Sequence, residues 1–201
     1  MSLFTLLELS ILVFSIILHE IAHGGVAFLF GDPTARNAGR LTLNPVPHID
    51  LMGSILLPLV LLFSGAHFLI GWAKPVPINV ARLGNPRRDF MFVGAAGPAT
   101  NLALAFLAAA AWKIFQPEGD AGRLLIYASV INVVLAAFNL MPIPPLDGSR
   151  IVMGLLPRRL AYEYGKLERY GMVIVLVLVV AGGFRYAVAP VAELLLRIMF
   201  A

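Results

Sequence analysis

Two histidines and a glutamate lie close together near the N-terminus, in the sequence IILHEIAHGG from Ile16 to Gly25. On a helix, His19 and His23 are one turn apart on the same face, a spacing that lets both imidazoles bind one metal ion. Glu20 lies beside that face, where it can act as a general base toward water during attack on a carbonyl. The spacing therefore predicts the site of a metal-dependent hydrolase.

The residues around this motif are apolar enough to place it inside a membrane. The chain of 201 residues is 60% hydrophobic and 13% charged, with a mean hydropathy of +0.88. These values exceed those of ordinary soluble domains. Ionisable side chains within a membrane helix are costly, so their clustering here indicates a function. The same helix carries one polar stripe, which must face protein or water and is formed by Glu8, Ser15, His19 and His23.

The apolar runs predict about five to six membrane segments. A helix that spans a bilayer needs about 20 mostly apolar residues. The runs lie near residues 3–30, 51–71, 90–112, 124–146, 168–184 and, shorter, 186–200. No stretch of soluble composition and domain size separates them. We therefore expect an all-α polytopic membrane protein with a single domain over residues 1–201, whose core covers about 14–156 and whose peripheral C-terminal helices cover about 168–201.

The run at 51–71 permits two topologies. It either spans the membrane once or re-enters on the side from which it came, as Gly53, Pro58 and Gly65 would permit. Re-entry gathers more of the basic residues on one side, which the positive-inside rule favours, and places His19 toward the cytoplasmic half of a bacterial or archaeal cell membrane. The net charge of +4 is modest and dispersed among loops, which suits lipid headgroups and argues against nucleic acid.

A third metal ligand is expected, because a catalytic zinc usually has three protein ligands and one open position. The chain has no cysteine, so histidine and carboxylate side chains are the candidates. Asp147 follows Pro142, Pro144 and Pro145, which prevent a regular helix and leave backbone groups unpaired. In a membrane, such backbone must be buried in protein or line a wet cavity. The alternative is that the prolines end one helix and Asp147 caps the next.

With these residues the chain resembles the site-2 proteases, intramembrane zinc metalloproteases marked by H-E-x-x-H in one helix and N-x-x-P-x-P-x-L-D-G in a later one. Both motifs are complete, and GPATN at 97–101 and GWAKPVP at 71–77 agree with a core helix and a short membrane-associated β-loop of the family. The resemblance implies a catalytic core of three helices, with zinc held by His19, His23 and Asp147 and Glu20 as the general base. The chain looks like a minimal form without a PDZ or nucleotide-sensing module.

Two asparagines are candidates for binding the substrate or the developing oxyanion. Asn139 shares a helix face with Ser129 and Asn132 and can reach a substrate backbone. Asn101 is the weaker candidate of the two. For Asn132 we expect hydrogen bonds between helices, as is common for amides buried in membranes.

Residues 76–80 alternate apolar and polar side chains, which suits an edge strand that pairs with an extended substrate. The alternative is an amphipathic loop packed on the headgroups. The remaining histidines, His48 and His67, are expected to be structural or interfacial rather than ligands.

The expected activity is that of an intramembrane zinc metalloendopeptidase. It would cut membrane-protein substrates in or near a transmembrane segment during regulated intramembrane proteolysis. The protein would lie in the lipid bilayer, and substrate selection would fall to its core or to a separate regulatory partner. The alternative is a metal-binding membrane protein without proteolytic activity, such as a divalent-cation permease or a silent chaperone or adaptor. Glu20 separates the two, because transport requires ligands that release the metal and hydrolysis requires a base beside it.

Overall fold

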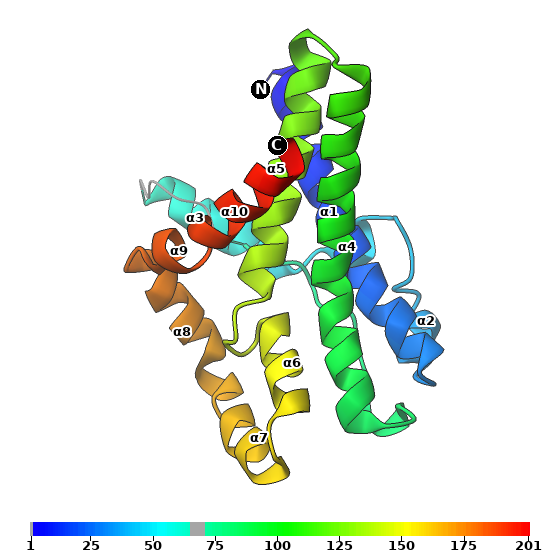
Figure 1. Cartoon of the computed structure of the whole chain (residues 1–201). Helices are drawn as coiled ribbons and strands as arrows, with labels where there is room; N and C mark the ends of the chain where they lie inside the picture. Colours follow the sequence, from blue (N-terminus) through cyan, green and yellow to red (C-terminus); the bar gives the residue numbers. More distant parts are fainter. Residues whose placement is uncertain (1, 65–70) are drawn as a thin grey trace.

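Three long helices form the body of the molecule. The computed structural model describes residues 2–64 and 71–201, and within these residues every regular element is helical. Helices α1 (Leu3–Leu29), α4 (Pro86–Phe115) and α5 (Gly119–Asn139) pack side by side (Figure 1). All three are long and apolar enough to cross a membrane. The prediction of an all-α fold with a three-helix core is confirmed for the described residues.

Helix α4 is the central helix, because it packs against α1, α5 and α6. Its buried face is built largely from small side chains, including Gly94, Gly97, Ala105 and Ala109. Small residues let helix backbones approach closely in a membrane, where van der Waals packing replaces the hydrophobic effect as the main attraction. The sequence of α4 therefore brings its neighbours close enough for their polar side chains to meet.

Shorter elements surround this body. They are α2 (Thr34–Asn37), the 3₁₀ turn η1 (Val46–His48), the π-helical turn η2 (Leu51–Leu56), α3 (Leu57–Phe63), the 3₁₀ turn η3 (Val80–Arg82), α6 (Asp147–Leu155), α7 (Arg158–Gly165), α8 (Glu168–Val180), α9 (Gly183–Ala187) and α10 (Ala189–Phe200). Helix α8 has 13 residues and α10 has 12, too few to cross a bilayer at about 1.5 Å per residue. The predicted number of five to six membrane segments is not confirmed.

The predicted boundaries also shift at the proline-rich sequence. The run at 124–146 was expected to be one segment, but α5 begins at Gly119 and ends at Asn139. The residues from Leu140 to Leu146 are turns, because Pro142, Pro144 and Pro145 cannot continue the helical hydrogen bonds. Asp147 then opens α6 as its first residue. This irregular connection returns the chain to the level of His19 on α1.

The two ends of the 51–71 run lie next to each other. Trp72 N–H donates to Gly53 O at 3.2 Å, and Ser54 Oγ donates to Trp72 O at 2.9 Å. Lys74 N–H donates to His48 O at 2.9 Å. A segment that spans a bilayer once separates its ends by about 30 Å, so these contacts agree with the re-entrant alternative. Gly65 and His67 lie outside the described residues.

The predicted β-loop is not confirmed, because the described residues 71–79 contain no strand. Their backbone groups bond to separate elements instead of a neighbouring strand. Val76 N–H donates to the Glu20 carboxylate at 2.8 Å, and Asn79 N–H donates to the Asp32 carboxylate at 2.6 Å. Residues 71–79 therefore form an extended coil, held at its middle by Glu20 and at its C-terminal end by Asp32. We call these residues the extended segment.

Candidate metal centre

The H-E-x-x-H sequence lies on a regular part of α1, which presents its two histidines to the interior. The imidazole rings of His19 and His23 meet edge to face with centroids 4.6 Å apart. Their Nε2 atoms are 3.0 Å apart, and both residues are buried. The helical spacing read from the sequence thus gives the expected pair of nitrogens pointing at one place.

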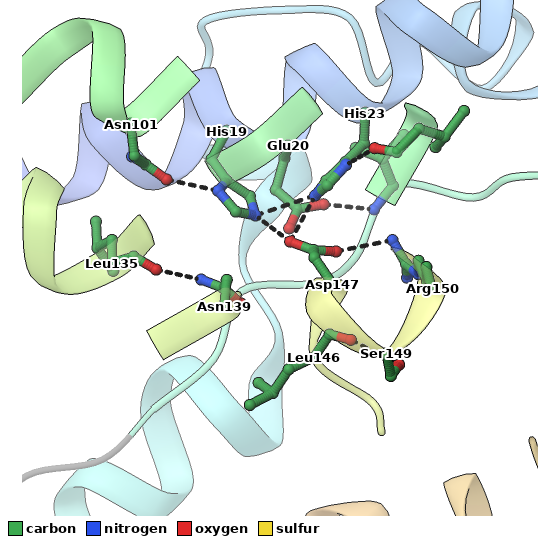
Figure 2. Close-up of polar contacts among 12 residues, drawn as sticks. His19, Glu20, His23, Asn101, Leu135, Asn139, Leu146, Asp147, Ser149 and Arg150 are labelled. Atoms are coloured by element: carbon green, nitrogen blue, oxygen red, sulfur yellow. Dashed lines mark hydrogen bonds and ion pairs between the residues drawn. The ribbon is translucent and has the colours of Figure 1, made fainter. Parts of the chain in front are cut away.

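Asp147 joins the two histidines from the other end of the chain. Its Oδ2 lies 3.0 Å from His19 Nε2 and 3.1 Å from His23 Nε2 (Figure 2). Its Oδ1 accepts a hydrogen bond from Arg150 Nη1 at 3.0 Å. Leu146 occupies the N-cap position of α6, and no side chain caps this helix end with a hydrogen bond. The Asp147 carboxylate points at the histidines instead. The alternative in which Asp147 serves only as a helix cap is therefore not favoured.

Helix α4 supplies a hydrogen-bond acceptor for each imidazole. His23 Nδ1 donates to the backbone carbonyl of Val93 at 2.6 Å. His19 Nδ1 lies 2.6 Å from Asn101 Oδ1. Both Nδ1 atoms are thereby engaged on the α4 side, which leaves the Nε2 atoms directed at Asp147. Such partners orient the ligands of metal sites and fix their ring positions.

The space between His19, His23 and Asp147 fits a metal ion. One ligand atom from each of His19, His23 and Asp147 lies within 4.8 Å of the others. A Cβ atom built on Gly97 of α4 would lie 2.5 Å from Nε2 of both histidines, so only glycine leaves this space free. Two imidazole nitrogens and one carboxylate oxygen match the ligand set of catalytic zinc sites. The donor chemistry and the glycine cradle both fit zinc.

Glu20 is not among the three residues of this metal-ligand group. Its Oε2 accepts the Val76 N–H from the extended segment at 2.8 Å. It lies in the walls of two adjoining cavities, of about 230 and 270 Å³, together with His19. A carboxylate held beside a metal site but outside its ligands has the position of a general base.

The two cavities differ in character. The smaller is lined mainly by apolar side chains from several helices, among them Ile16, Leu135, Phe138, Met172 and Val175. The larger is lined by more polar groups, among them His23, Asp147, Arg150 and Glu168. Both contact the metal centre, so a peptide lying across it would meet an apolar side and a polar side.

The two candidate asparagines occupy different environments. Asn139 lies in the wall of both cavities, and its Nδ2 donates to Leu135 O at 2.9 Å within its own helix. Asn101 is completely buried and bonded to His19. His48 is buried, with Nε2 3.0 Å from Thr42 O, and is not part of the metal-ligand group found among the described residues.

Sequence reasoning missed three residues around the ligands. Val93, Gly97 and Arg150 had been given no role, although Gly97 belongs to the GPATN sequence. A signal was present, because Val93, Gly97 and Asn101 are spaced by four residues and so fall on one helix face. Arg150 follows Asp147 by three residues, a spacing that places them together at the start of a helix.

The model of peptidase family M50 matches residues 114–182. YwhC of Bacillus subtilis strain 168, named as a zinc metalloprotease, is 38% identical over 188 residues, which cover 89% of this chain and 82% of YwhC. The chain belongs to peptidase family M50. The resemblance to the site-2 proteases is thereby confirmed.

A second relative of this M50 peptidase is Rip2 of Mycolicibacterium smegmatis, also named as a zinc metalloprotease. It is 30% identical over 168 residues, which cover 83% of this chain and 63% of Rip2. No solved structure gives a significant match. The family and the names of these relatives agree with the metalloprotease and zinc predictions, and the apolar helices agree with a multi-pass membrane protein.

Proposed function

We propose that this M50 peptidase hydrolyses peptide bonds in or near transmembrane segments of other membrane proteins, in a bacterial or archaeal cell membrane. One observation carries the proposal: two histidines and an aspartate converge among apolar helices, with a glutamate beside them that is not part of the group. The whole chain, residues 1–201, would act as a single membrane-embedded domain, and regulated intramembrane proteolysis is the process that its family suggests.

In the proposed site, His19, His23 and Asp147 would hold the zinc ion. Bound zinc supplies Lewis-acid polarisation of the scissile carbonyl and lowers the pKa of water. Glu20 takes the proton from the attacking water and returns it to the nitrogen of the leaving amine. The Val76 N–H holds one Glu20 oxygen, while Oε1 accepts no hydrogen bond from the described residues. One oxygen thus fixes the carboxylate and the other is available for proton transfer.

The substrate would lie across the two cavities in an extended form. A transmembrane helix shields its peptide bonds with internal hydrogen bonds, so a local unwound stretch must enter the site. The apolar cavity suits a side chain from the membrane segment itself. Asn139, in the wall of both cavities, can bond the backbone of that stretch or the oxyanion that develops.

The re-entrant arrangement of residues 51–71 is part of the proposal. It rests on the contacts that join Trp72 to Gly53 and Lys74 to His48. Single cysteines in place of Asp50 and Lys74 should react with a membrane-impermeant thiol reagent from the same side of a sealed vesicle. Labelling from opposite sides would mean that the segment crosses the bilayer.

The non-proteolytic alternative is disfavoured by the position of Glu20. A transporter would use such a carboxylate along the metal path, whereas here the extended segment holds it outside the ligand group. A bound ion that exchanges across the membrane, with no cleavage of any membrane substrate, would support the alternative.

The direct test compares wild type with Glu20→Gln in vesicles that contain model single-span substrates. The wild type should cleave a substrate, and Glu20→Gln should lose cleavage by at least about a thousandfold because no base remains. Glu8→Gln is the matched control, since Glu8 is another glutamate of α1 and lies more than three turns before Glu20. Cleavage by Glu20→Gln at the wild-type rate would contradict the proposal.

A further inference from the structure

A chain of buried polar side chains ends on the metal-facing histidine of α1. It begins at Ser15 on α1, passes through Asn132 on α5 and Asn101 on α4, and reaches His19. Ser15, Asn132 and Asn101 have 4%, 2% and 0% of their surface exposed. The chain therefore lies in the interior where α1, α4 and α5 pack together, with no solvent to replace a missing hydrogen bond.

The orientation of the Asn132 amide is fixed by a backbone group. Its Nδ2 donates to Ala128 O at 2.9 Å and to Ser15 Oγ at 2.8 Å. A carbonyl oxygen only accepts hydrogen bonds, so the atom facing Ala128 must be the nitrogen. The Asn132 oxygen is consequently the atom that faces Asn101.

The orientation of the Asn101 amide is fixed in the same way. Asn101 Nδ2 lies 2.8 Å from Asn132 Oδ1 and 3.4 Å from the backbone carbonyl of Ser15. Both neighbours are acceptors, so this atom must be the donating nitrogen. Asn101 Oδ1 is thereby directed at His19 Nδ1, 2.6 Å away. An amide oxygen cannot donate, so the proton of this hydrogen bond must reside on His19 Nδ1.

We propose that Ser15, Asn132 and Asn101 act as a positioning relay that fixes His19 as the Nδ1–H tautomer. A neutral imidazole with its proton on Nδ1 presents the Nε2 lone pair, the atom that faces Asp147 and would bind zinc. The inference deepens the proposed function, since it concerns how this chain prepares its own ligand for the metal.

The two histidines explain why a relay is needed at only one of them. His23 Nδ1 donates to the carbonyl of Val93, a backbone group that cannot exchange donor for acceptor. His19 instead meets a side-chain amide, which would offer its NH₂ group if it rotated by half a turn. The relay prevents that rotation by anchoring the amide orientations to Ala128 and Ser15. Asn101, a candidate for substrate binding from the sequence, thus has both polar atoms engaged inside the protein.

The test measures zinc affinity by competition with a chelator in detergent-purified protein. Asn101→Leu removes the acceptor for His19 and should weaken zinc binding by about 10- to 100-fold, the usual cost of losing such a partner. Asn101→Asp keeps an acceptor for His19 Nδ1 but loses the N–H that donates to Asn132, so it should weaken zinc binding clearly less than the leucine variant does. Partial recovery of zinc affinity in the aspartate variant would not follow from a merely structural role of Asn101.

Serine substitutions provide a matched pair for the far end of the relay. Ser15→Ala removes an acceptor of Asn132 and should weaken zinc binding several-fold. Ser129→Ala removes another buried hydroxyl of the same helix bundle, one that contacts Met199 Sδ at 4.0 Å, and should leave zinc affinity unchanged. Equal losses in both variants would indicate general loosening of the bundle and overturn the relay.

A second measurement reads the tautomer without metal. In metal-free protein labelled with ¹⁵N-histidine, His19 should carry a proton on Nδ1 that is hydrogen-bonded to Asn101, and Asn101→Leu should lose this hydrogen bond. Wild-type affinity in Asn101→Leu, a loss in Asn101→Asp as large as in the leucine variant, or a His19 Nδ1 without a proton would each overturn the inference. A wild type that binds no zinc yet shows the Nδ1–H tautomer would leave the relay standing and refute the metal site.

Discussion

The α4 side and the extended-segment side of the site are built in different ways. On the α4 side, a regular helix places Val93, Gly97 and Asn101 against the two histidines, and the contacts are buried. On the other side, a coil without regular structure reaches Glu20 through one backbone N–H, that of Val76. The metal ligands thus depend on helix packing, while the proposed base depends on how one loop is held.

This difference predicts that metal binding and catalysis can be damaged separately. Changes on the α4 side should release the metal and so abolish activity with it. Changes in the extended segment should leave the metal bound and slow the chemistry. A site in which every substitution affected both properties equally would argue against this division.

Among substitutions outside the ligands and Glu20, the largest effect is expected at Gly97 on the α4 side. In Gly97→Val, the added side chain occupies the space between His19 Nε2 and His23 Nε2, since a Cβ alone would lie 2.5 Å from each. Zinc affinity should fall by about 100-fold or more, and cleavage should fall with it. Chelator competition and a cleavage assay on the same preparations measure both.

Gly25→Ala is the control for that substitution. Gly25 is also a helical glycine, on α1, and a Cβ built there meets no atom within 4 Å. Zinc binding should be unchanged and stability should rise by about 0.5–1 kcal/mol, because alanine favours helix. A comparable loss of zinc in both variants would show that α1 and α4 tolerate no substitution, rather than that Gly97 forms a cradle.

The α1 half of the site could be predicted from the sequence, and the α4 half only in part. Positions four apart on a helix must share a face, so His19 and His23 were placed by local geometry alone. Asp147 required the proline-rich motif and a known family, because its approach depends on an irregular connection. Val93 contributes a backbone carbonyl, and no side-chain pattern can reveal such a group.

The extended segment was predicted least well. Alternation at residues 76–80 suggested a strand, but a strand forms only where a second strand offers matching backbone groups. Here the N–H groups of Val76 and Asn79 meet carboxylates instead, those of Glu20 and Asp32. Sequence periodicity contains no information about these distant partners, so it gave the extended form and missed the pairing.

An intermediate effect is expected at Val76. Val76→Pro removes the N–H that fixes Glu20 and should lower kcat about tenfold, which is the rate equivalent of one hydrogen bond to a charged group. Val76→Ala keeps this N–H and loses only side-chain packing, so it should retain most of the rate. Zinc content should match wild type in both variants. Loss of zinc in the proline variant alone would contradict the separation of the two sides.

The smallest effect on activity is expected at Asp32, which anchors the far end of the segment. Its carboxylate is fully buried and accepts hydrogen bonds from Asn79 N–H, at 2.6 Å, and from the N–H and hydroxyl of Thr34. Asp32→Asn replaces one acceptor by a donor, so it should lower the free energy of unfolding by about 1–3 kcal/mol and cleavage only a few-fold.

The pH dependence of stability sharpens this prediction. Burial would raise the pKa of Asp32, but the hydrogen bonds from Thr34 and Asn79 outweigh it and hold the pKa below its ordinary value. The unfolded state therefore binds the proton more readily, and the stabilisation present above about pH 4 is lost as the pH falls through the folded-state pKa. Thermal unfolding of wild type should show this loss, and Asp32→Asn should show less of it.

The central claim is that His19, His23 and Asp147 hold one catalytic zinc, and that Glu20 acts beside it as the general base without being a ligand. Elemental analysis of purified wild type, Glu20→Gln and Asp147→Ala, with cleavage assayed in the same preparations, tests it most directly. The account predicts about one zinc per chain in wild type and in inactive Glu20→Gln, and a clear loss in Asp147→Ala. Folded wild-type protein that takes up no zinc when supplied with it, or Asp147→Ala that retains full zinc and activity, would contradict the account.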